Sequence, residues 1–88
     1  MIDIRQKSIV VTGGASGIGA AICTAACEEG AAVGIIDIDS DAAVSLCRKL
    51  GPRAWCASGD VESESSMHAA LEALSVNMPV FSGCVTSA

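Results

Sequence analysis

The fold can be inferred from one segment, Thr12-Gly13-Gly14-Ala15-Ser16-Gly17-Ile18-Gly19. It follows the apolar run at 9–11 and precedes residues 17–29, which have the spacing of a helix. Glycines between a strand and a helix permit a tight turn, and the N–H groups that begin the helix attract an anion. The spacing is G-x-x-x-G-x-G rather than the commoner G-x-G-x-x-G. It predicts a site for the pyrophosphate of a dinucleotide.

The rest of the chain alternates between strand-like and helix-like segments. Strands are expected at 7–12, 32–36, 53–58 and 80–85. Helices are expected at 17–29, from Asp39-Ser40-Asp41 to about residue 50, and from about Ser63 to a point before Pro79. Gly30 is expected to end the first helix and Gly51-Pro52 the second. Short connections between alternating elements predict an α/β fold with a parallel sheet and right-handed crossovers.

Composition excludes several classes of function. The chain is 51% hydrophobic and 17% charged, with a mean hydropathy of +0.54, which is typical of a globular domain. Its net charge of −5, with no basic cluster beyond Arg48-Lys49, argues against binding to nucleic acid or to an anionic membrane surface. Residues 8–27 carry no charge, but their four glycines, their Ser and Thr residues and the predominance of Ala make them a poor candidate for a membrane span. Residues 1–7 lack the apolar core of a secretory signal. A soluble, cytoplasmic protein is expected.

The cysteines form an odd set without a C-x-x-C pair: Cys23, Cys27, Cys47, Cys56 and Cys84. Reduced, buried thiols are therefore expected rather than a disulfide framework. Cys23 and Cys27 are four residues apart on the first expected helix, so they could in principle share a metal ion. No second pair of ligands lies near them in the sequence, and His68 stands alone. Two small core-facing side chains are the preferred interpretation, and no metal site is predicted.

Asp37 ends the second expected strand, 18 residues after Gly19. A carboxylate at this distance from a glycine turn can accept hydrogen bonds from both hydroxyls of an adenosine ribose, and it would repel a 2′-phosphate. No Arg or Lys adjoins it, so NAD is preferred over NADP. The alternative is that Asp37, together with Asp39, caps the next helix.

Asp60-Val61 follows the third expected strand. The carboxylate of Asp60 could accept a hydrogen bond from the adenine amino group, while the next backbone N–H meets a ring nitrogen. An ordinary helix N-cap is an equally good interpretation of Asp60 from the residues alone.

Together these residues resemble the short-chain dehydrogenase/reductase family. Its signature T-G-x-x-x-G-[IL]-G is matched throughout by Thr12 to Gly19, its acidic residue by Asp37 and its Asp-Val by Asp60-Val61. The resemblance implies a partial Rossmann-like, doubly wound parallel sheet with strand order 3-2-1-4, ending at strand four. It implies hydride transfer between NAD and an alcohol or carbonyl substrate. The cofactor-binding residues it implies are Gly13, Ser16, Gly17, Ile18, Gly19, Asp37, Asp60, Val61 and Thr86.

The chain departs from the family in two places. The family's Asn-Asn-Ala-Gly falls where Thr86-Ser87-Ala88 stand, so the cofactor contact at Thr86 would be made by a hydroxyl. Its catalytic Ser and Tyr-x-x-x-Lys lie beyond the fourth strand. This chain has no tyrosine, and its lysines, Lys7 and Lys49, are placed away from the cofactor edge. Residues 1–88 therefore look like the dinucleotide-binding half of such a domain without the catalytic half, and no catalytic residue is assigned.

Two further expectations follow. A sheet that ends at an uncharged fourth strand has an open edge, so the chain alone is expected to be marginally stable and prone to self-association.

The leading hypothesis for function is that the chain is the NAD-binding portion of an oxidoreductase and is not catalytic alone. The alternative is a non-catalytic module that binds NAD or pairs with a partner. A P-loop is disfavoured because Ala20 replaces its Lys. A methyltransferase would have little use for the Gly17-Ile18-Gly19 helix start.

Overall fold

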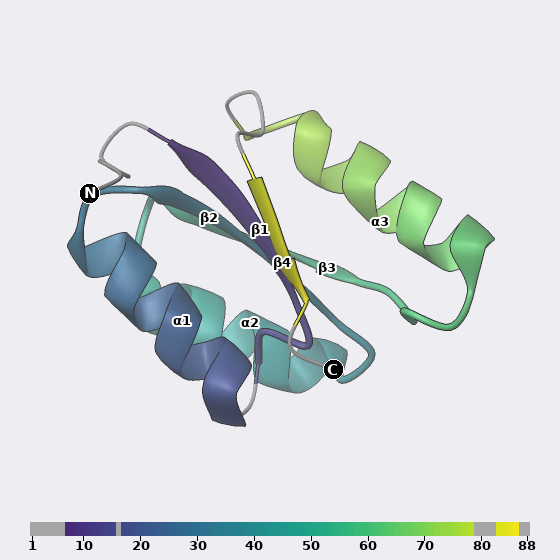
Figure 1. Cartoon of the computed structure of the whole chain (residues 1–88), viewed down its shortest axis with the longest axis horizontal. Coiled ribbons are helices and arrows are strands. Elements are labelled where there is room, and N and C mark those ends of the chain that lie inside the picture. The colour runs from purple at the N-terminus through teal and green to yellow at the C-terminus, as the bar shows by residue number, and fades with distance from the viewer. Residues whose placement is uncertain (1–6, 16, 79–82, 87–88) are drawn as a thin grey trace.

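Strands and helices alternate along the chain (Figure 1). The computed structural model describes residues 7–15, 17–78 and 83–86. Their order is β1 (Ser8–Thr12), α1 (Gly17–Glu28), β2 (Ala32–Asp37), α2 (Ser40–Leu50), β3 (Ala54–Ser58), α3 (Glu64–Ser75) and β4 (Gly83–Thr86). The alternation expected from the sequence is confirmed for three strands and three helices. The first and third strands each begin one residue later than expected. Residues 80–82 of the fourth expected strand lie outside the described part.

The strands form one parallel sheet in the order β3-β2-β1-β4. β1 pairs with β2 from Ser8↔Ala32 to Thr12↔Ile36, and with β4 as far as Thr12↔Thr86. β3 pairs with β2 as far as Asp37↔Ser58. All four carboxyl ends therefore meet at one edge of the sheet, which is where open α/β sheets bind their ligands.

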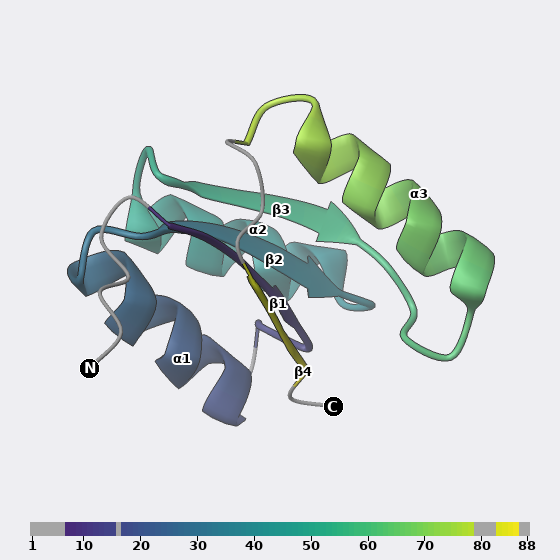
Figure 2. The ribbon, with the colours of Figure 1, turned by 45° about the horizontal axis from the view of Figure 1, so that its top comes forward.

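Helices cover both faces of the sheet. Figures 1 and 2 show α1 and α2 on one face and α3 on the other. This follows from the strand order, because β1 to β2 to β3 moves across the sheet in one direction and β3 to β4 returns. Right-handed crossovers then place α3 opposite the first two helices. β2 lies between the two helical layers, and residues 32–36 are all buried.

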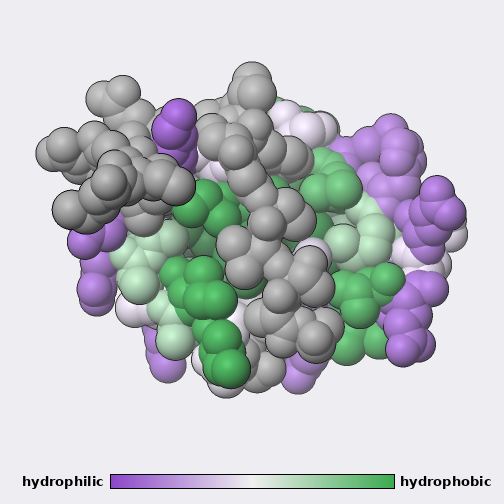
Figure 3. Space-filling view, in the orientation of Figure 1, coloured by the Kyte–Doolittle hydropathy of each residue, from purple (hydrophilic) through white to green (hydrophobic). Residues whose placement is uncertain are grey.

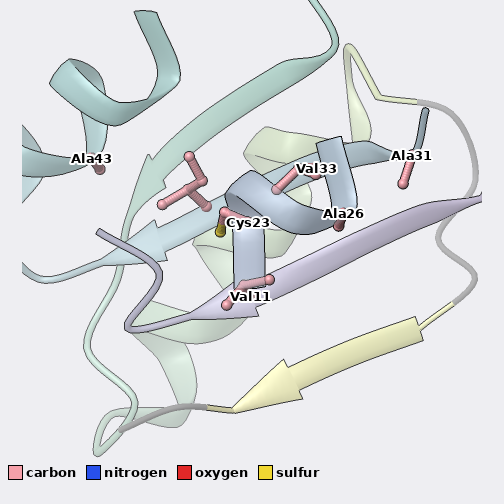
Figure 4. Packing of buried hydrophobic residues seen from close by; sticks show 7 residues of the cluster. Val11, Cys23, Ala26, Ala31, Val33 and Ala43 are labelled. Carbon is pink, nitrogen blue, oxygen red and sulfur yellow. The ribbon is translucent and has the colours of Figure 1, made fainter. Parts of the chain in front are cut away.

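Two hydrophobic clusters hold the layers together. The first joins α1 and α2 to the sheet, and Figure 4 shows Cys23 and Ala26 of α1 packed near Val11 and Val33. The second joins α3 to the opposite face through Val10, Ile36, Ala70, Leu74 and Met78. Each fully buried Val, Ile or Leu stabilises the fold by about 1.5–3 kcal/mol.

α3 can pack closely against the sheet because two positions beneath it are glycines. A Cβ on Gly34 would lie 2.7 Å from Met78 Sδ and 3.1 Å from Leu74 Cδ1. On Gly59 it would lie 2.8 Å from Ile36 Cγ2 and 3.1 Å from Ala70 Cβ. The helix that follows β3 therefore packs directly onto the backbone of the sheet, against the middle of β2 at Gly34 and against the residue that follows β3 at Gly59.

The helix ends are formed by the residues that the sequence predicts. Gly30 has a φ of 90°, its N–H donates to Cys27 O, and the Ala31 N–H donates to Ala26 O, so α1 ends in a Schellman motif. Asp39 caps α2 by accepting a hydrogen bond from the Ala42 N–H at 3.1 Å.

Polar and apolar residues are separated on the face of the molecule that is seen in the orientation of Figure 1. On this face, Figure 3 shows hydrophilic residues at the outer ends and hydrophobic residues nearer the middle. Among the described residues, no helix has the length and apolar character needed to cross a membrane.

Candidate functional site

The turn between β1 and α1 lies at the carboxyl edge of the sheet and confirms the strand–turn–helix expected around the glycines. Gly13 has a φ of 66°, and its N–H donates to Ile36 O at 2.7 Å. Gly17 has a φ of 54° and begins α1. Apart from its chain neighbours and the backbone of α1, no described atom lies within 4 Å of a Cβ built on Gly17, so the described structure leaves space beside this helix start. Ser16 lies outside the described residues.

Gly14 has a packing role that the sequence did not separate from the rest of the turn. It is buried, and a Cβ there would lie 3.0 Å from Val11 O, 3.1 Å from Cys23 Sγ and 3.2 Å from Ile35 Cγ2. The Cys23 thiol donates to Gly14 O at 3.7 Å. Burial, together with the neighbouring Cys27, raises the pKa of Cys23 from 9.0 to about 11, so the thiol stays protonated at neutral pH and remains a donor.

Asp37 lies directly beside the glycine turn. Its Oδ2 accepts a hydrogen bond from the Ala15 N–H at 3.1 Å, and its Oδ1 accepts from the Asp39 N–H at 3.0 Å. The N-cap of α2 is Asp39, so the alternative in which Asp37 caps that helix is wrong. The carboxylate instead ties the turn after β1 to the loop after β2.

Asp60 belongs to a turn that is fixed by its own hydrogen bonds. The Glu62 N–H donates to Asp60 Oδ1 at 2.9 Å, and the Ser63 N–H donates to Asp60 O at 3.0 Å. The N-cap of α3 is Ser63, which accepts from the Ser66 N–H. The interpretation of Asp60 as a helix N-cap is therefore wrong. The Gly59 N–H donates to Asp37 O at 3.2 Å, which holds this turn beside Asp37.

Large apolar side chains are exposed in the segments that follow β1, β2 and β3. Ile18 is 76% exposed, Ile38 is 70% exposed and Val61 is 44% exposed. Ile38 was missed as a site residue by the sequence reasoning. The available signal was an apolar residue between Asp37 and Asp39, directly after a strand, where a solvated loop would carry a polar residue. Exposed apolar groups beside carboxylates suit the faces of an aromatic base.

The remaining predicted residues lie at the same edge. Gly19 is buried in the first turn of α1. Thr86 ends β4 in register with Thr12, one strand away from the glycine turn. The structure thus brings the segments of β1, β2, β3 and β4 that carry the predicted residues to one edge of the sheet.

Cys23 and Cys27, the pair that could in principle share a metal ion, make other contacts in the fold. Cys23 packs in the first cluster, and the Cys27 thiol donates to Leu50 O at 3.6 Å. Within the described ranges, no group of three His, Cys, Asp or Glu side chains is arranged to hold a metal ion.

The chain belongs to the short-chain dehydrogenase family, because residues 7–88 match the model of that family, described as short chain dehydrogenase. This establishes the resemblance inferred from the glycine turn. A relative from Xanthobacter autotrophicus, 2-(S)-hydroxypropyl-CoM dehydrogenase 3, is 33% identical over 88 residues, which cover 97% of this chain and 34% of the relative.

Solved structures give the same result. A 3-ketoacyl-(acyl-carrier-protein) reductase from Brucella melitensis, complexed with NADH, matches 83% of this chain with a TM-score of 0.79 and 31% identity. A short chain dehydrogenase/reductase from Burkholderia phymatum, in complex with NAD, matches 85% with a TM-score of 0.79 and 25% identity. This chain spans 30% and 28% of those two chains.

Proposed function

We propose that residues 1–88 form the dinucleotide-binding half of an oxidoreductase that transfers hydride between NAD and an alcohol or carbonyl substrate. The observation that carries this proposal is the turn after β1, where Gly17 leaves open space at a helix start and the Asp37 carboxylate lies hydrogen-bonded to the same turn. The NADH and NAD complexes of the two structural relatives support a nicotinamide dinucleotide as the ligand.

The pyrophosphate is bound by the first turn of α1. The N–H groups of Gly13 and Ala15 are already engaged inside the fold, with Ile36 O and with Asp37. The donors assigned to phosphate in this proposal are Ser16, Gly17, Ile18 and Gly19, because the first N–H groups of a helix lack intrahelical partners and the helix dipole favours an anion. Gly13 contributes the shape of the turn.

Asp37 selects NAD over NADP. Both of its carboxylate oxygens accept hydrogen bonds from backbone N–H groups, which fix its orientation and leave acceptor capacity for ribose hydroxyls. A ribose 2′-phosphate would bring a second negative charge against this carboxylate. Within the described ranges, no ion pair of Asp37 with a cation is present to offset that repulsion.

The adenine is recognised at the turn after β3. Asp60 accepts from the adenine amino group, the Val61 backbone N–H meets a ring nitrogen, and the exposed side chains of Ile38 and Val61 contact the faces of the base. Apolar contact with the two faces and polar contact with the edge are how proteins commonly bind a purine.

The cofactor contact expected at Thr86, which ends β4 at the same edge of the sheet, is part of this proposal. When bound, this cofactor accepts or donates the hydride, and residues 1–88 bind and orient it. No proton donor to the substrate is assigned among residues 1–88, which contain no tyrosine. The alternative is a non-catalytic module that binds NAD or pairs with another chain along β4, the edge of the described sheet. Binding without turnover would favour it.

Titration of the chain with NAD and NADP tests the proposal, with Trp55 fluorescence and melting temperature as readouts. Saturable stabilisation by NAD at millimolar concentration or below is expected, and NADP should bind at least about tenfold more weakly. Gly13→Val should abolish the effect of NAD, because a β-branched residue is strained at a φ of 66° and would displace the turn. No response to either cofactor would overturn the proposal, and preference for NADP would overturn the role of Asp37.

A further inference from the structure

The turn that carries Asp60 and Val61 depends on one side chain from the following helix. One of its backbone bonds is local, from the Ser63 N–H to Asp60 O, and another, from the Gly59 N–H to Asp37 O, joins it to the end of β2. The Asp60 N–H instead donates to Ser66 Oγ at 3.0 Å, six residues along the chain. This hydrogen bond joins the first residue of the turn to α3.

Helix capping does not account for Ser66. The capping oxygen of α3 is Ser63 Oγ, which accepts from the Ser66 N–H at 3.2 Å. Ser66 therefore contributes its N–H to the cap and its hydroxyl to the turn. An alanine at this position would keep the cap and raise helix propensity, but it would remove the acceptor for the Asp60 N–H.

α3 is a rigid support for this bond. Ala70 and Leu74 are each 2% exposed and pack in the second cluster together with Ile36. A Cβ on Gly59 would lie 3.1 Å from Ala70 Cβ, so the helix and the start of the turn are in direct contact. Ser66 lies one helical turn before Ala70, so its hydrogen bond with the Asp60 N–H fixes Asp60 relative to the packed helix.

The orientation of Asp60 determines which of its oxygens can face a ligand. Oδ1 accepts from the Glu62 N–H at 2.9 Å. Among the described residues no hydrogen bond to Oδ2 is present, so Oδ2 keeps both of its acceptor positions for a base amino group, whereas Oδ1 keeps one. Since Oδ2 moves with the Asp60 backbone, a displaced Asp60 N–H would shift it away from the position that an amino group must occupy.

We propose that Ser66 is a positioning residue that makes this site specific for a purine with a 6-amino group. It acts through Asp60 and does not touch the cofactor. This inference rests on the proposed NAD site and adds to it the residue on which base selectivity depends. Hypoxanthine, which carries a 6-oxo group in place of the amino group, would face the Asp60 carboxylate with an acceptor and be rejected.

The test compares the binding of NAD with that of nicotinamide hypoxanthine dinucleotide, which differs from NAD only in the base. The wild-type chain should prefer NAD by about tenfold, the effect of one hydrogen bond to a charged acceptor. Ser66→Ala should reduce this preference to less than about threefold by weakening NAD alone. Ser66→Thr keeps the hydroxyl and should restore the preference, which a loss of helix stability would not explain.

Ser65→Ala is the matched control. Ser65 lies in the same helical turn, is exposed, and has a hydroxyl within hydrogen-bond distance of Ser63 Oγ (3.4 Å) rather than of the turn, so its removal should leave the preference unchanged. Ser66→Cys, which is nearly isosteric and accepts hydrogen bonds weakly, provides a second variant if the alanine chain does not fold. Asp60→Ala should abolish the preference, and adding Ser66→Ala to it should change nothing further.

The outcomes separate the two proposals. If the wild-type chain binds neither dinucleotide, the proposed function fails. If it binds NAD and prefers it, but Ser66→Ala or Ser66→Cys retains the full preference, the function stands and the role of Ser66 is overturned. A Ser66→Thr variant that behaves like Ser66→Ala would also overturn it.

Discussion

The turns after β1 and β3 lie at the same edge of the sheet but are built in opposite ways. The turn after β1 consists of small residues and leaves open space at Gly17. The turn after β3 satisfies its own backbone, through Asp60, Ser63 and Ser66, and presents side chains outward. A phosphate is bound by backbone N–H groups, which every residue except proline has, provided that no side chain blocks the approach of the ligand. A base is distinguished only by groups of particular chemistry held in fixed positions.

The largest expected effect separates two glycines of the first turn. Gly14→Val should destabilise the fold by about 1–3 kcal/mol or more, because its Cβ would lie 3.0–3.2 Å from three buried atoms. Gly17→Val meets no such atoms, and it should cost stability mainly through its φ of 54° while abolishing NAD binding. Chemical denaturation and NAD titration of both variants measure the two effects. Equal loss of stability in both would contradict the division between packing and binding.

Asp37→Asn should sharpen the comparison by removing charge while keeping shape. The amide oxygen can still accept from the Ala15 or the Asp39 N–H, so the turn should remain in place. NAD binding should weaken by about tenfold, and discrimination against NADP should fall by a similar factor, because the repulsion of the 2′-phosphate is gone. Isothermal titration with both cofactors measures this. A variant that still rejects NADP as strongly as the wild type would show that another group excludes the phosphate.

Ile38→Ser tests the apolar contact with the base. The side chain is 70% exposed in the absence of ligand, so the melting temperature should change little. NAD affinity should fall by about three- to tenfold, because burial of part of an isoleucine against adenine contributes about 1 kcal/mol. Val76→Ser, at a residue 78% exposed at the far end of α3, is the control and should leave affinity unchanged. Equal affinities for the Ile38→Ser and wild-type chains would remove Ile38 from the site.

The smallest effect concerns the thiol beneath the first turn. Burial raises the pKa of Cys23 from 9.0 to about 11, so the folded state holds this proton more tightly than the unfolded state. Its contribution to stability is complete below pH 9 and is lost as the pH rises to about 11. Cys23→Ala should therefore lose less stability than the wild type over this interval, and the melting temperatures of the two chains at pH 8 and pH 11 measure the difference.

Cys47 behaves similarly and limits the size of that difference. Burial and the neighbouring Cys56 raise the pKa of Cys47 to about 11, and this thiol remains in the Cys23→Ala chain. The variant should therefore still become less stable above pH 9. If the melting temperatures of the two chains fell by the same amount between pH 8 and pH 11, the assignment to Cys23 would be contradicted.

The strands, helices and glycine turn were predictable because their signals are local. Apolar runs, capping residues such as Asp39, and the Gly30 helix end act through neighbours within a few residues. The sequence also predicted Asp37 and Asp60 as candidate site residues. It did not resolve their alternatives as helix caps, since the choice between Asp60 and Ser63 depends on where α3 begins, and sequence patterns locate boundaries only to within a few residues.

Side-chain functions that depend on contacts between segments were not predictable. Gly14 and Gly17 lie three residues apart in one short segment, yet only packing against Cys23 and Ile35 makes the first a core position. The exposure of Ile38 and the bond from Asp60 to Ser66 likewise arise when β2, β3 and α3 come together.

The order of the residues was sufficient to specify a strand–turn–helix with a nearby carboxylate, because hydrophobic periodicity and glycine conformation are properties of short segments. Folding was required to assign each residue to the core, to the backbone of a turn or to the ligand edge. Those roles are set by distances between atoms far apart in the chain, and parallel strands meet only through the tertiary structure.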